Sequence, residues 1–400
     1  MSSTRGPVGP EHGSLAERGA QIMAEHWRPQ GFTCPNSTTY PWLWLWDSCF
    51  HSIIWGHLGD PERALTELAT ALSSQDADGF VPHLAYLNGY DGHSEFWGRS
   101  GASSITQPPI YGHTVAELTR LGIEVPEELR VKATAGLNYL LRERRRSSSG
   151  LIELVHPWES GCDHSPRWDD LMAPGNVDSA LDPYDKDIWF HRKGELLGSI
   201  ARSASGAPLW NPEFPVGSVA FSAIVAFCAE ELASVTHDED LARMGRELGA
   251  ELQGRWDSEL RTWVDDGPTA SGSGRIRTLE ALLPLLVETD TSAIGEVVAE
   301  LTDPAAFGGE FGLRQVHPGE SRFAAGSYWR GPTWPQLDYL LWIALKRAGN
   351  SEVASTVAER TGHGAERSGF AEYWDSDSGE PGGAMPQSWA VLAICMKDFI

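Results

Sequence analysis

The chain has 400 residues, of which 41% are hydrophobic and 22% are charged, a composition typical of a globular protein. Its 55 Asp and Glu residues outnumber its 31 Lys and Arg residues, which gives a formal net charge of −24. A surface of this sign repels phosphate backbones and anionic lipids, so we expect neither a nucleic-acid partner nor a membrane partner.

The first residues contain no sign of a targeting segment. Residues 1–13 lack the apolar region of a signal peptide, and no stretch of the chain reaches transmembrane length by inspection. The five cysteines form no CxxC pair, which argues against a disulfide framework and against a zinc ribbon. We therefore predict a cytoplasmic protein, with a disordered lead over residues 1–13 and a single domain over residues 14–400.

From Ser14 onward the spacing of apolar residues is mainly helical. Ser14 and Glu17 form a capping-box pattern, and Asp60 followed by Pro61 is typical of the cap and first residue of another helix. Further helical patterns cover 126–146, 185–203, 217–234, 238–257, 276–288, 292–302, 333–348, 350–362 and 385–399. About twelve helices with roughly 33 residues each are compatible with a ring of helical hairpins.

Long connections rich in Gly, Pro and aromatic residues separate these helices. Loops of this length are uncommon in a compact domain unless they are functional. They cover residues 76–111, 150–184, 258–275, 303–332 and 363–384, and they contain many of the Trp, Asp, Glu and His residues. The chain has 17 Trp, whose flat faces suit stacking on sugar rings, although large helical proteins also bury Trp in their cores.

The first candidate cluster is an alternating run of tryptophans that ends on a carboxylate. Period two predicts that Trp42, Trp44 and Trp46 share one side of an extended segment and that Asp47 points the other way. A helix is expected to begin near Asp47, with Asp47 as its cap. The segment alone is equally compatible with a sugar-stacking wall and with a buried aromatic strand.

Three further segments carry polar groups suited to ligand binding. Gln107, before two prolines, and His83, after one, lie in an extended loop, where either contacts a ligand or serves the structure. Residues 156–170 contain four carboxylates among aromatic residues, with Gly161 allowing close approach of the backbone. This pattern favours a general acid over a calcium loop, because the spacing does not match an EF-hand.

The last segment, residues 369–383, places Glu372 beside two aromatic residues. A carboxylate between aromatic rings loses hydration, which raises its pKa unless a cation compensates. Two carboxylates from distant segments fit glycoside hydrolysis, in which one protonates the leaving oxygen and the other activates water.

Taken together, five motifs resemble the signature set of glycoside hydrolase family 63, in that family's order over roughly residues 40–390. The motifs are WLWDSCFHS, SSITQPP, ESGCDHSPRWD, YWRGPTWP and FAEYWDSDSG. Within the family they are most similar to those of the bacterial mannosylglycerate and glucosylglycerate hydrolases. The resemblance implies an all-α fold, an (α/α)6 toroid with long active-site loops. It also implies inversion of anomeric configuration, a small-molecule glycoside as substrate, and no metal or organic cofactor.

The resemblance also implies roles for individual residues. Asp163 corresponds to the family's general acid and Glu372 to its general base. An acid that works near neutral pH must be protonated, so we expect apolar or negatively charged surroundings for Asp163. The sugar-binding positions correspond to Tyr40, Trp44, Trp46, Asp47, Gln107, Tyr328, Trp329 and Trp334. Gln387 corresponds to a glutamine that helps to hold the glycerate.

One departure from the family concerns the leaving group. The glycerate-conjugate hydrolases hold the glycerate carboxylate with an arginine between the acid motif and the next long helix. Residues 168–191 contain no Arg, Lys186 is their only cation, and Tyr184 is aligned loosely with a family tyrosine. An ammonium does not reproduce the bidentate binding of a carboxylate by a guanidinium. The motifs therefore support hydrolysis of a glycosidic bond more strongly than they support glycerate as the leaving group.

The predicted function is thus an inverting α-glycosidase, with glucosylglycerate or mannosylglycerate as the main candidate substrates. An α-glucosidase acting on a neutral disaccharide or a glucosylglycerol-like conjugate is the first alternative. A sugar epimerase that uses His83, His164 or His191 is another, since fold alone does not decide function. A non-catalytic carbohydrate-binding protein is the third. The choice between glucose and mannose and the oligomeric state, with a homo-oligomer as one option, stay open.

Overall fold

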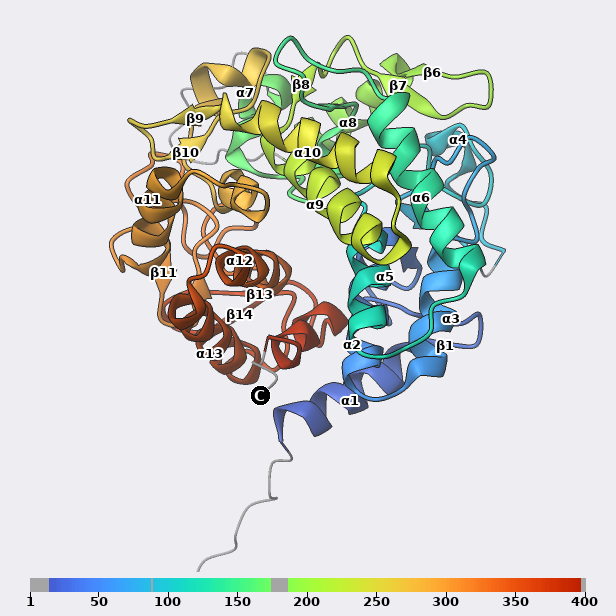
Figure 1. Ribbon diagram of the computed structural model, residues 1–400, viewed down its shortest axis with the longest axis horizontal. Helices are drawn as coiled ribbons and strands as arrows, with labels where there is room; N and C mark the ends of the chain where they lie inside the picture. Colours follow the sequence, from blue (N-terminus) through green and yellow to red (C-terminus); the bar gives the residue numbers. More distant parts are fainter. Residues whose placement is uncertain (1–13, 88, 174–185, 397–400) are drawn as a thin grey trace, which may run out of the picture.

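The computed structural model describes residues 14–87, 89–173 and 186–396 (Figure 1). The predicted disordered lead, Tyr184 and the side chain of Lys186 lie outside the described residues.

Six helical elements form an inner ring within the described part of the chain. They are α2 (Leu45–His57), α5 (Tyr111–Arg120), α9 (Val219–Thr236), η5 (Leu279–Leu286), α12 (Pro335–Arg347) and η6 (Ser388–Ile394). Each contacts the next in this order and η6 contacts α2, so the ring is closed. In Figure 1, α2, α5, α9 and α12 surround the centre of the molecule. Every residue of η5 and of η6 is buried.

Six outer helices cover the inner ring. They are α1 (Leu15–His26), α3 (Pro61–Ala71), α6 (Glu127–Arg142), α10 (Glu239–Gln253), α11 (Thr291–Thr302) and α13 (Ser351–Arg367). Each contacts an inner element, in the pairs η6 with α1, α2 with α3, α5 with α6, α9 with α10, η5 with α11 and α12 with α13, and some of them contact two inner elements, as α6 contacts α5 and α9. Because inner and outer elements alternate along the chain, the inner elements run in the same sense and their amino ends gather at one end of the ring.

The long connections contain short elements and two-stranded antiparallel sheets. The sheets pair β1 (Trp27–Arg28) with β2 (Phe32–Thr33), β3 (Leu43–Trp44) with β4 (Leu84–Ala85), β5 (Glu153–Leu154) with β8 (Val216–Gly217), β6 (Ala201–Arg202) with β7 (Pro208–Trp210), β9 (Trp256–Asp257) with β10 (Thr262–Trp263), β11 (Gly308–Gly309) with β12 (Gly312–Leu313), and β13 (Tyr373–Trp374) with β14 (Pro381–Gly382). The remaining helical elements are α4 (Ser94–Trp97), η1 (Pro157–Ser160), η2 (Pro166–Trp168), α7 (Asp169–Met172), α8 (Lys186–Ser199), η3 (Pro268–Ala270) and η4 (Gly272–Gly274).

The predicted helix starts at α1 and α3 are confirmed. Ser14 accepts from the Glu17 amide while the Glu17 carboxylate accepts from the Ser14 amide, which completes the capping box. Asp60 accepts from the Arg63 amide, and Pro61 occupies the first turn of α3. These starts depend on contacts within four residues, so local sequence is enough to specify them.

Other predicted elements need correction. The prediction that Asp47 caps α2 is wrong, because the helix begins at Leu45 and Asp47 lies inside its first turn. The patterns at 276–288 and 385–399 form the 3-10 elements η5 and η6 rather than α-helices. Pro284 lies inside η5, where it removes a backbone donor and crowds the preceding turn.

Two inner helices depart from the sequence prediction in other ways. The helix α5 was not predicted. In it, a Cβ on Gly112 would lie 2.6 Å from the carbonyl oxygen of Cys228, so glycine permits close packing on α9. The helix α9 is long and apolar enough to cross a membrane, which corrects the prediction that no stretch reaches this length. However, 78% of it is buried inside the protein, as expected for a core helix.

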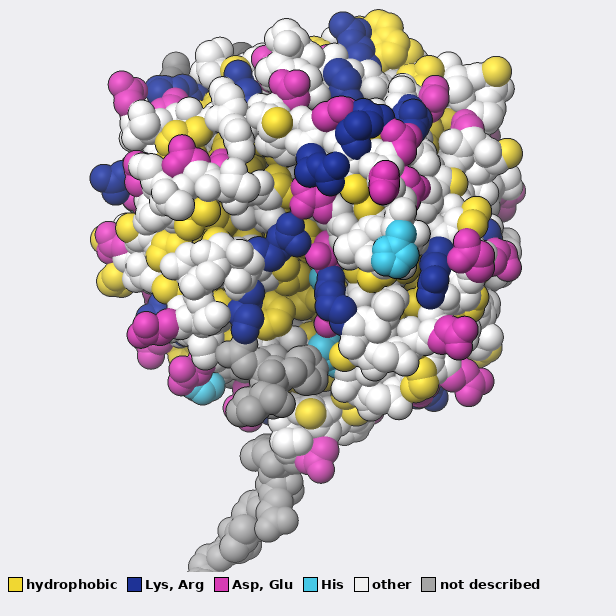
Figure 2. Space-filling view, viewed as in Figure 1, with side chains coloured by type: hydrophobic (Ala, Val, Ile, Leu, Met, Phe, Trp, Pro, Cys, Tyr) yellow, Lys and Arg dark blue, Asp and Glu magenta, His cyan; other side chains and the backbone are white. Residues whose placement is uncertain are grey.

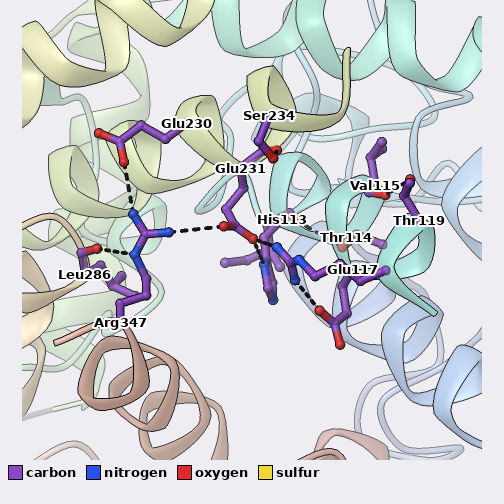
Figure 3. A network of polar contacts seen from close by, with 12 residues as sticks. His113, Thr114, Val115, Glu117, Thr119, Glu230, Glu231, Ser234, Leu286 and Arg347 are labelled. Atoms are coloured by element: carbon purple, nitrogen blue, oxygen red, sulfur yellow. Dashed lines mark hydrogen bonds and ion pairs between the residues drawn. The ribbon is translucent and has the colours of Figure 1, made fainter. Parts of the chain in front are cut away.

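The carboxyl ends of four inner elements are joined by a network of charged groups (Figure 3). Arg347 of α12 binds Glu231 of α9 at 3.1 Å, Glu230 at 3.0 Å and the Leu286 carbonyl of η5 at 2.9 Å. Arg120 of α5 pairs with Glu231 as well. Charges of both signs lie close together on the molecular face seen in Figure 2, which limits repulsion within an acidic chain.

Candidate active site

A cavity of about 490 Å³ lies at the end of the ring where the inner elements begin. Its wall includes Trp46 and Asp47 from the first turn of α2, and Gln387 and Trp389 from the start of η6. The remaining described lining residues come from the long connections and from α8. They are Pro35, Tyr40, Trp44, His83, Gln107, Trp158, Gly161, Asp163, His164, Asp187, Phe190, Lys193, Tyr328, Trp329 and Glu372.

Asp163 lies in the loop between η1 and η2, with its side chain 16% exposed. Its Oδ2 accepts a hydrogen bond from Trp158 Nε1 at 3.1 Å and lies 2.9 Å from Lys193 Nζ and 3.3 Å from His164 Nε2. Burial raises the pKa of Asp163, but His164 and Lys193 outweigh burial and lower this pKa to about 2. The expectation of apolar or negative surroundings that keep this carboxyl protonated is therefore wrong for the unliganded protein.

Lys193 is the residue that sequence analysis missed. It lies on α8, its side chain is 4% exposed, and its ammonium is 2.6 Å from His164 Nε2 and 4.9 Å from the centre of the Trp158 ring. Asp187, Phe190 and Lys193 follow one another at three-residue spacing, so they share the face of α8 that lines the cavity. The helical spacing of these three residues is visible in the sequence, and it shows that they share a face. It does not show that this face contacts the cavity.

Glu372 precedes β13 on another part of the wall, and it is 3% exposed. Its Oε1 accepts from Tyr40 Oη at 3.1 Å and its Oε2 accepts from the Ala384 amide at 2.8 Å. Burial raises the pKa of Glu372 to about 7, although these two hydrogen bonds favour the charged form. The predicted direction of this pKa shift is confirmed, and the group titrates close to neutral pH.

Two glycines leave room for the candidate catalytic groups. A Cβ on Gly383, whose φ is +72°, would lie 2.3 Å from Glu372 Oε2. A Cβ on Gly161, whose φ is +76°, would lie 2.6 Å from the Trp46 ring, which confirms the close approach expected there. The conformations and the crowding both require glycine.

The alternating tryptophans do not form one wall. Trp44 and Trp46 line the cavity, whereas Trp42 packs against Tyr86, with ring centres 5.3 Å apart. The predicted alternation fails because β3 ends at Trp44 and Trp46 already lies in α2. Asp47 also lines the cavity, and burial holds its pKa well above the usual range.

The fourth motif contributes a stacked pair of indoles. Tyr328 and Trp329 line the cavity as predicted, but Trp334 does not. Trp334 lies behind Trp329, with ring centres 3.6 Å apart and planes within 1° of parallel. Its predicted place in the lining is wrong, because it begins the buried face of α12 and supports Trp329 instead. Trp329 has a φ of +54°, a strained backbone conformation for a tryptophan.

Polar atoms that face the cavity are available to a ligand. Gln107 Oε1 accepts from the Trp46 amide at 3.3 Å, which leaves its amide nitrogen as a donor. Within the described residues, Gln387 Oε1 and Trp44 Nε1 are buried and have no hydrogen-bond partner. Buried polar groups without partners are costly, so these atoms indicate a polar ligand or bound water.

The histidines proposed for the epimerase alternative are not arranged as an acid–base pair. His191 is 81% exposed and lies outside the described cavity lining. His83 lines the cavity, but it is 2.5 Å from Ser103 Oγ, and burial lowers its pKa to about 3. A neutral, hydrogen-bonded His83 does not serve as an acid at neutral pH. His164 lines the cavity, but its Nε2 lies against Lys193 Nζ at 2.6 Å and Asp163 Oδ2 at 3.3 Å, so the geometry does not support an acid–base pair of histidines.

Comparison with known proteins agrees with this arrangement. The family model of the mannosylglycerate hydrolase MGH1-like glycoside hydrolase domain matches residues 40–390 of this chain. The glucosylglycerate hydrolase of Mycolicibacterium hassiacum is 29% identical over 416 residues, covering 89% of this chain and 91% of that protein. The mannosylglycerate hydrolase of Thermus thermophilus is 28% identical over 405 residues, with coverage of 91% and 96%.

Solved structures show the same fold. The glycoside hydrolase family 63 mannosylglycerate hydrolase of Thermus thermophilus, in complex with Tris and D-glycerate, has a TM-score of 0.80 at 25% identity. The match covers 95% of this chain and 99% of that chain. The same enzyme in complex with glucose has a TM-score of 0.78 at 25% identity and covers 96% and 99%. The chain therefore belongs to the mannosylglycerate hydrolase MGH1-like family of glycoside hydrolases.

Proposed function

We propose that this chain is an inverting α-glycosidase that hydrolyses glucosylglycerate or mannosylglycerate. The observation that carries the proposal is the convergence of two carboxylates from distant segments, Asp163 and Glu372, on one aromatic cavity. The names of the relatives support the substrate class, and one relative was solved with glucose and, separately, with D-glycerate.

In the proposed reaction the two carboxylates act on opposite sides of the bond. Asp163 protonates the glycosidic oxygen as its bond to the anomeric carbon breaks. Glu372 accepts a proton from the water that attacks this carbon from the other face, so the sugar is released with inverted configuration. The hydrogen bonds from Tyr40 and the Ala384 amide to Glu372 hold the base in place.

The sugar is held by the groups that line the deeper part of the cavity. We assign stacking to Trp44, Trp46 and Trp329, because indole faces suit the apolar faces of sugar rings. Asp47 and Gln107 offer acceptors and donors for hydroxyl groups, and Gln387 has an unpartnered acceptor for the polar leaving group. Tyr328 completes the wall.

The closed ring supports the toroid proposed from the sequence. Six inner elements that contact one another in a circle, with six outer helices packed around them, are the arrangement expected of an (α/α)6 toroid. In this arrangement the cavity lies at the amino ends of the inner elements and the charged network of Figure 3 lies at their carboxyl ends.

The leaving group is expected to be anionic. Among the described residues that line the cavity, Lys193 is the one Lys or Arg side chain. It lies next to Asp163, where the leaving group must lie when the acid protonates it. This cation therefore supplies the positive charge that the arginine-free segment does not.

A panel of α-linked substrates followed by proton NMR tests the function. Glucosylglycerate, mannosylglycerate, glucosylglycerol and a neutral α-glucosyl disaccharide are incubated with the protein, and the first anomer released is recorded. We expect the glycerate conjugates to be cleaved fastest, with β-sugar appearing first from an α-linked substrate. Release of α-sugar first would exclude inversion, and preference for the neutral substrates would exclude the proposed leaving group.

A substrate whose leaving group needs no protonation distinguishes the role of the acid from the role of the base. With an α-glucosyl fluoride, Asp163→Asn should retain far more activity relative to the wild type than it does with the glycerate conjugate. Glu372→Gln should lose activity on both, because attack by water always needs the base. The opposite pattern would show that the roles are exchanged.

A further inference from the structure

The pair formed by Asp163 and Lys193 conflicts with the acid role of Asp163 in the unliganded protein. The Lys193 ammonium and the Trp158 indole both donate to the same oxygen, Oδ2, and His164 lies beside it. Donors of this kind stabilise a carboxylate rather than a carboxylic acid. A general acid must carry a proton before it can give one, so something has to change when substrate binds.

The groups around Asp163 identify what can change. His83 and His156 lie near it, but burial lowers the pKa of both, so they stay neutral at neutral pH. Glu372, Tyr40 and Tyr328 line the same cavity and interact electrostatically with Asp163, and Asp187 lies on the α8 wall. His164 and Lys193 are the two groups that lower the pKa of Asp163. Of these, Lys193 donates directly to Oδ2, and its ammonium faces the same cavity as the acid.

Substrate geometry brings a second carboxylate to this point. In a sugar linked to the 2-oxygen of glycerate, the carboxylate is attached to the carbon that carries the glycosidic oxygen. When Asp163 is close enough to protonate that oxygen, the substrate carboxylate must lie beside Asp163 and the Lys193 ammonium. Two carboxylates that share one site cannot both remain ionised at low cost, and the pKa of one is raised. An α-alkoxy acid is the stronger acid, so the proton goes to Asp163.

We propose that Lys193 is a positioning residue that couples recognition of an anionic leaving group to protonation of Asp163. In the free enzyme Lys193 holds Asp163 ionised. The substrate carboxylate takes over the ammonium, and Asp163 takes up one proton from solvent. This inference rests on the proposed function, since it concerns the leaving group of the same reaction.

The proton balance of the cycle is complete. The proton that enters on Asp163 passes to the glycosidic oxygen as the bond between this oxygen and the anomeric carbon breaks. The attacking water forms the new bond to the anomeric carbon and gives one proton to Glu372, which returns it to solvent. One water is consumed, glycerate and the free sugar leave, and the Lys193 ammonium returns to Asp163.

The first test compares Lys193→Met with Lys193→Arg on glucosylglycerate and on glucosylglycerol. Removal of the ammonium raises the pKa of Asp163, so Lys193→Met should increase kcat/KM for the neutral conjugate at pH 7, because more of the variant carries a proton on Asp163. The same variant should lower kcat/KM for the glycerate conjugate by at least tenfold. Lys193→Arg should retain the preference for the anion. A merely structural role would lower both activities by the same factor, and that result would overturn the proposal.

The second test does not depend on a stable Lys193 variant. Glucosylglycerate is titrated into Glu372→Gln by calorimetry at pH 7 in buffers of different ionisation enthalpy. We expect net proton uptake with glucosylglycerate and none with glucosylglycerol. Absence of uptake with the anion would overturn this inference while leaving the proposed function intact if the wild type cleaves the substrate. A wild type that cleaves neither conjugate would overturn both.

Discussion

The polar environment of each carboxylate determines what it does at a given pH. Asp163 and Glu372 line one cavity, yet their pKa values are shifted in opposite directions. A cation and an indole donor stabilise the charge on Asp163, whereas burial disfavours the charge on Glu372. Sequence analysis named both residues, but it predicted the correct direction of the pKa shift only for Glu372. The aromatic neighbours of Glu372 are visible in the sequence, whereas Lys193 is not recognisable there as a neighbour of Asp163.

The pH dependence of activity follows from Glu372. A general base works in its ionised form, and the pKa of Glu372 is raised to about 7. We therefore expect kcat for the glycerate conjugate, which reports the complex in which Asp163 is protonated, to fall as the pH drops through about 7. Tyr40→Phe removes the hydrogen bond that favours the charged form, so it should move this acid limb to higher pH. A pH profile of kcat for both proteins measures the shift, and an unchanged limb would exclude Glu372 as its origin.

Gly383 provides a test of how sensitively the base is placed. Gly383→Ala would bring a Cβ within 2.3 Å of Glu372 Oε2, so the carboxylate must move. We expect a fall in kcat/KM of about 10- to 100-fold, as for other small misplacements of catalytic groups. Gly59→Ala is the matched control, because Gly59 also has a positive φ but has nothing within 4 Å of its Cβ position. Equal losses of kcat/KM in the two variants would contradict a local effect on Glu372.

Local sequence correctly predicted the starts of helices that are capped by residues a few positions away in the chain. The capping box of α1 and the Asp60–Pro61 start of α3 are examples. The same reasoning missed α5 and assigned α-helix to the 3-10 element η5. In α5 the decisive contact is with α9, at Gly112 and Cys228, and no local pattern in either segment reveals that the two helices meet.

Packing between α5 and α9 can be probed at this contact. Gly112→Ala should lower the free energy of unfolding by about 1–3 kcal/mol, because the added Cβ meets a backbone carbonyl that cannot turn away. Gly198→Ala in α8 should change it by less than about 1 kcal/mol, since nothing lies within 4 Å of that Cβ position. Denaturant unfolding measures both. Similar changes in the two variants would argue against the close contact.

At the scale of the whole molecule, the ring has two chemically different ends. The amino ends of α2 and η6 line the cavity. The carboxyl ends of inner elements carry a network in which Arg347 binds Glu230 and Glu231 (Figure 3), and Arg120 pairs with Glu231 as well. The network ties together α5, α9, η5 and α12, which are far apart in sequence. We infer that it stabilises ring closure rather than catalysis.

Arg347→Met separates these two roles. The variant should lose about 1–2 kcal/mol of unfolding free energy, because one guanidinium serves three acceptors on two other elements. Its KM and pH profile should match those of the wild type. Arg243→Met removes an exposed arginine that pairs only within α10 among the described residues, and it should cost less than about 0.5 kcal/mol. A change in the pH profile of Arg347→Met would contradict the separation of the two ends.

The sequence by itself determined the helical character, several helix starts, the family and the two candidate catalytic carboxylates. Apolar spacing, capping residues and ordered motifs are all expressed along the chain, so they do not depend on which segments meet. Only the tertiary structure decided that Trp42 and Trp334 lie outside the cavity, that the inner elements close into a ring, and that Lys193 pairs with Asp163. These outcomes depend on contacts between distant segments, and through-space charge and burial determine which protonation state each carboxylate adopts.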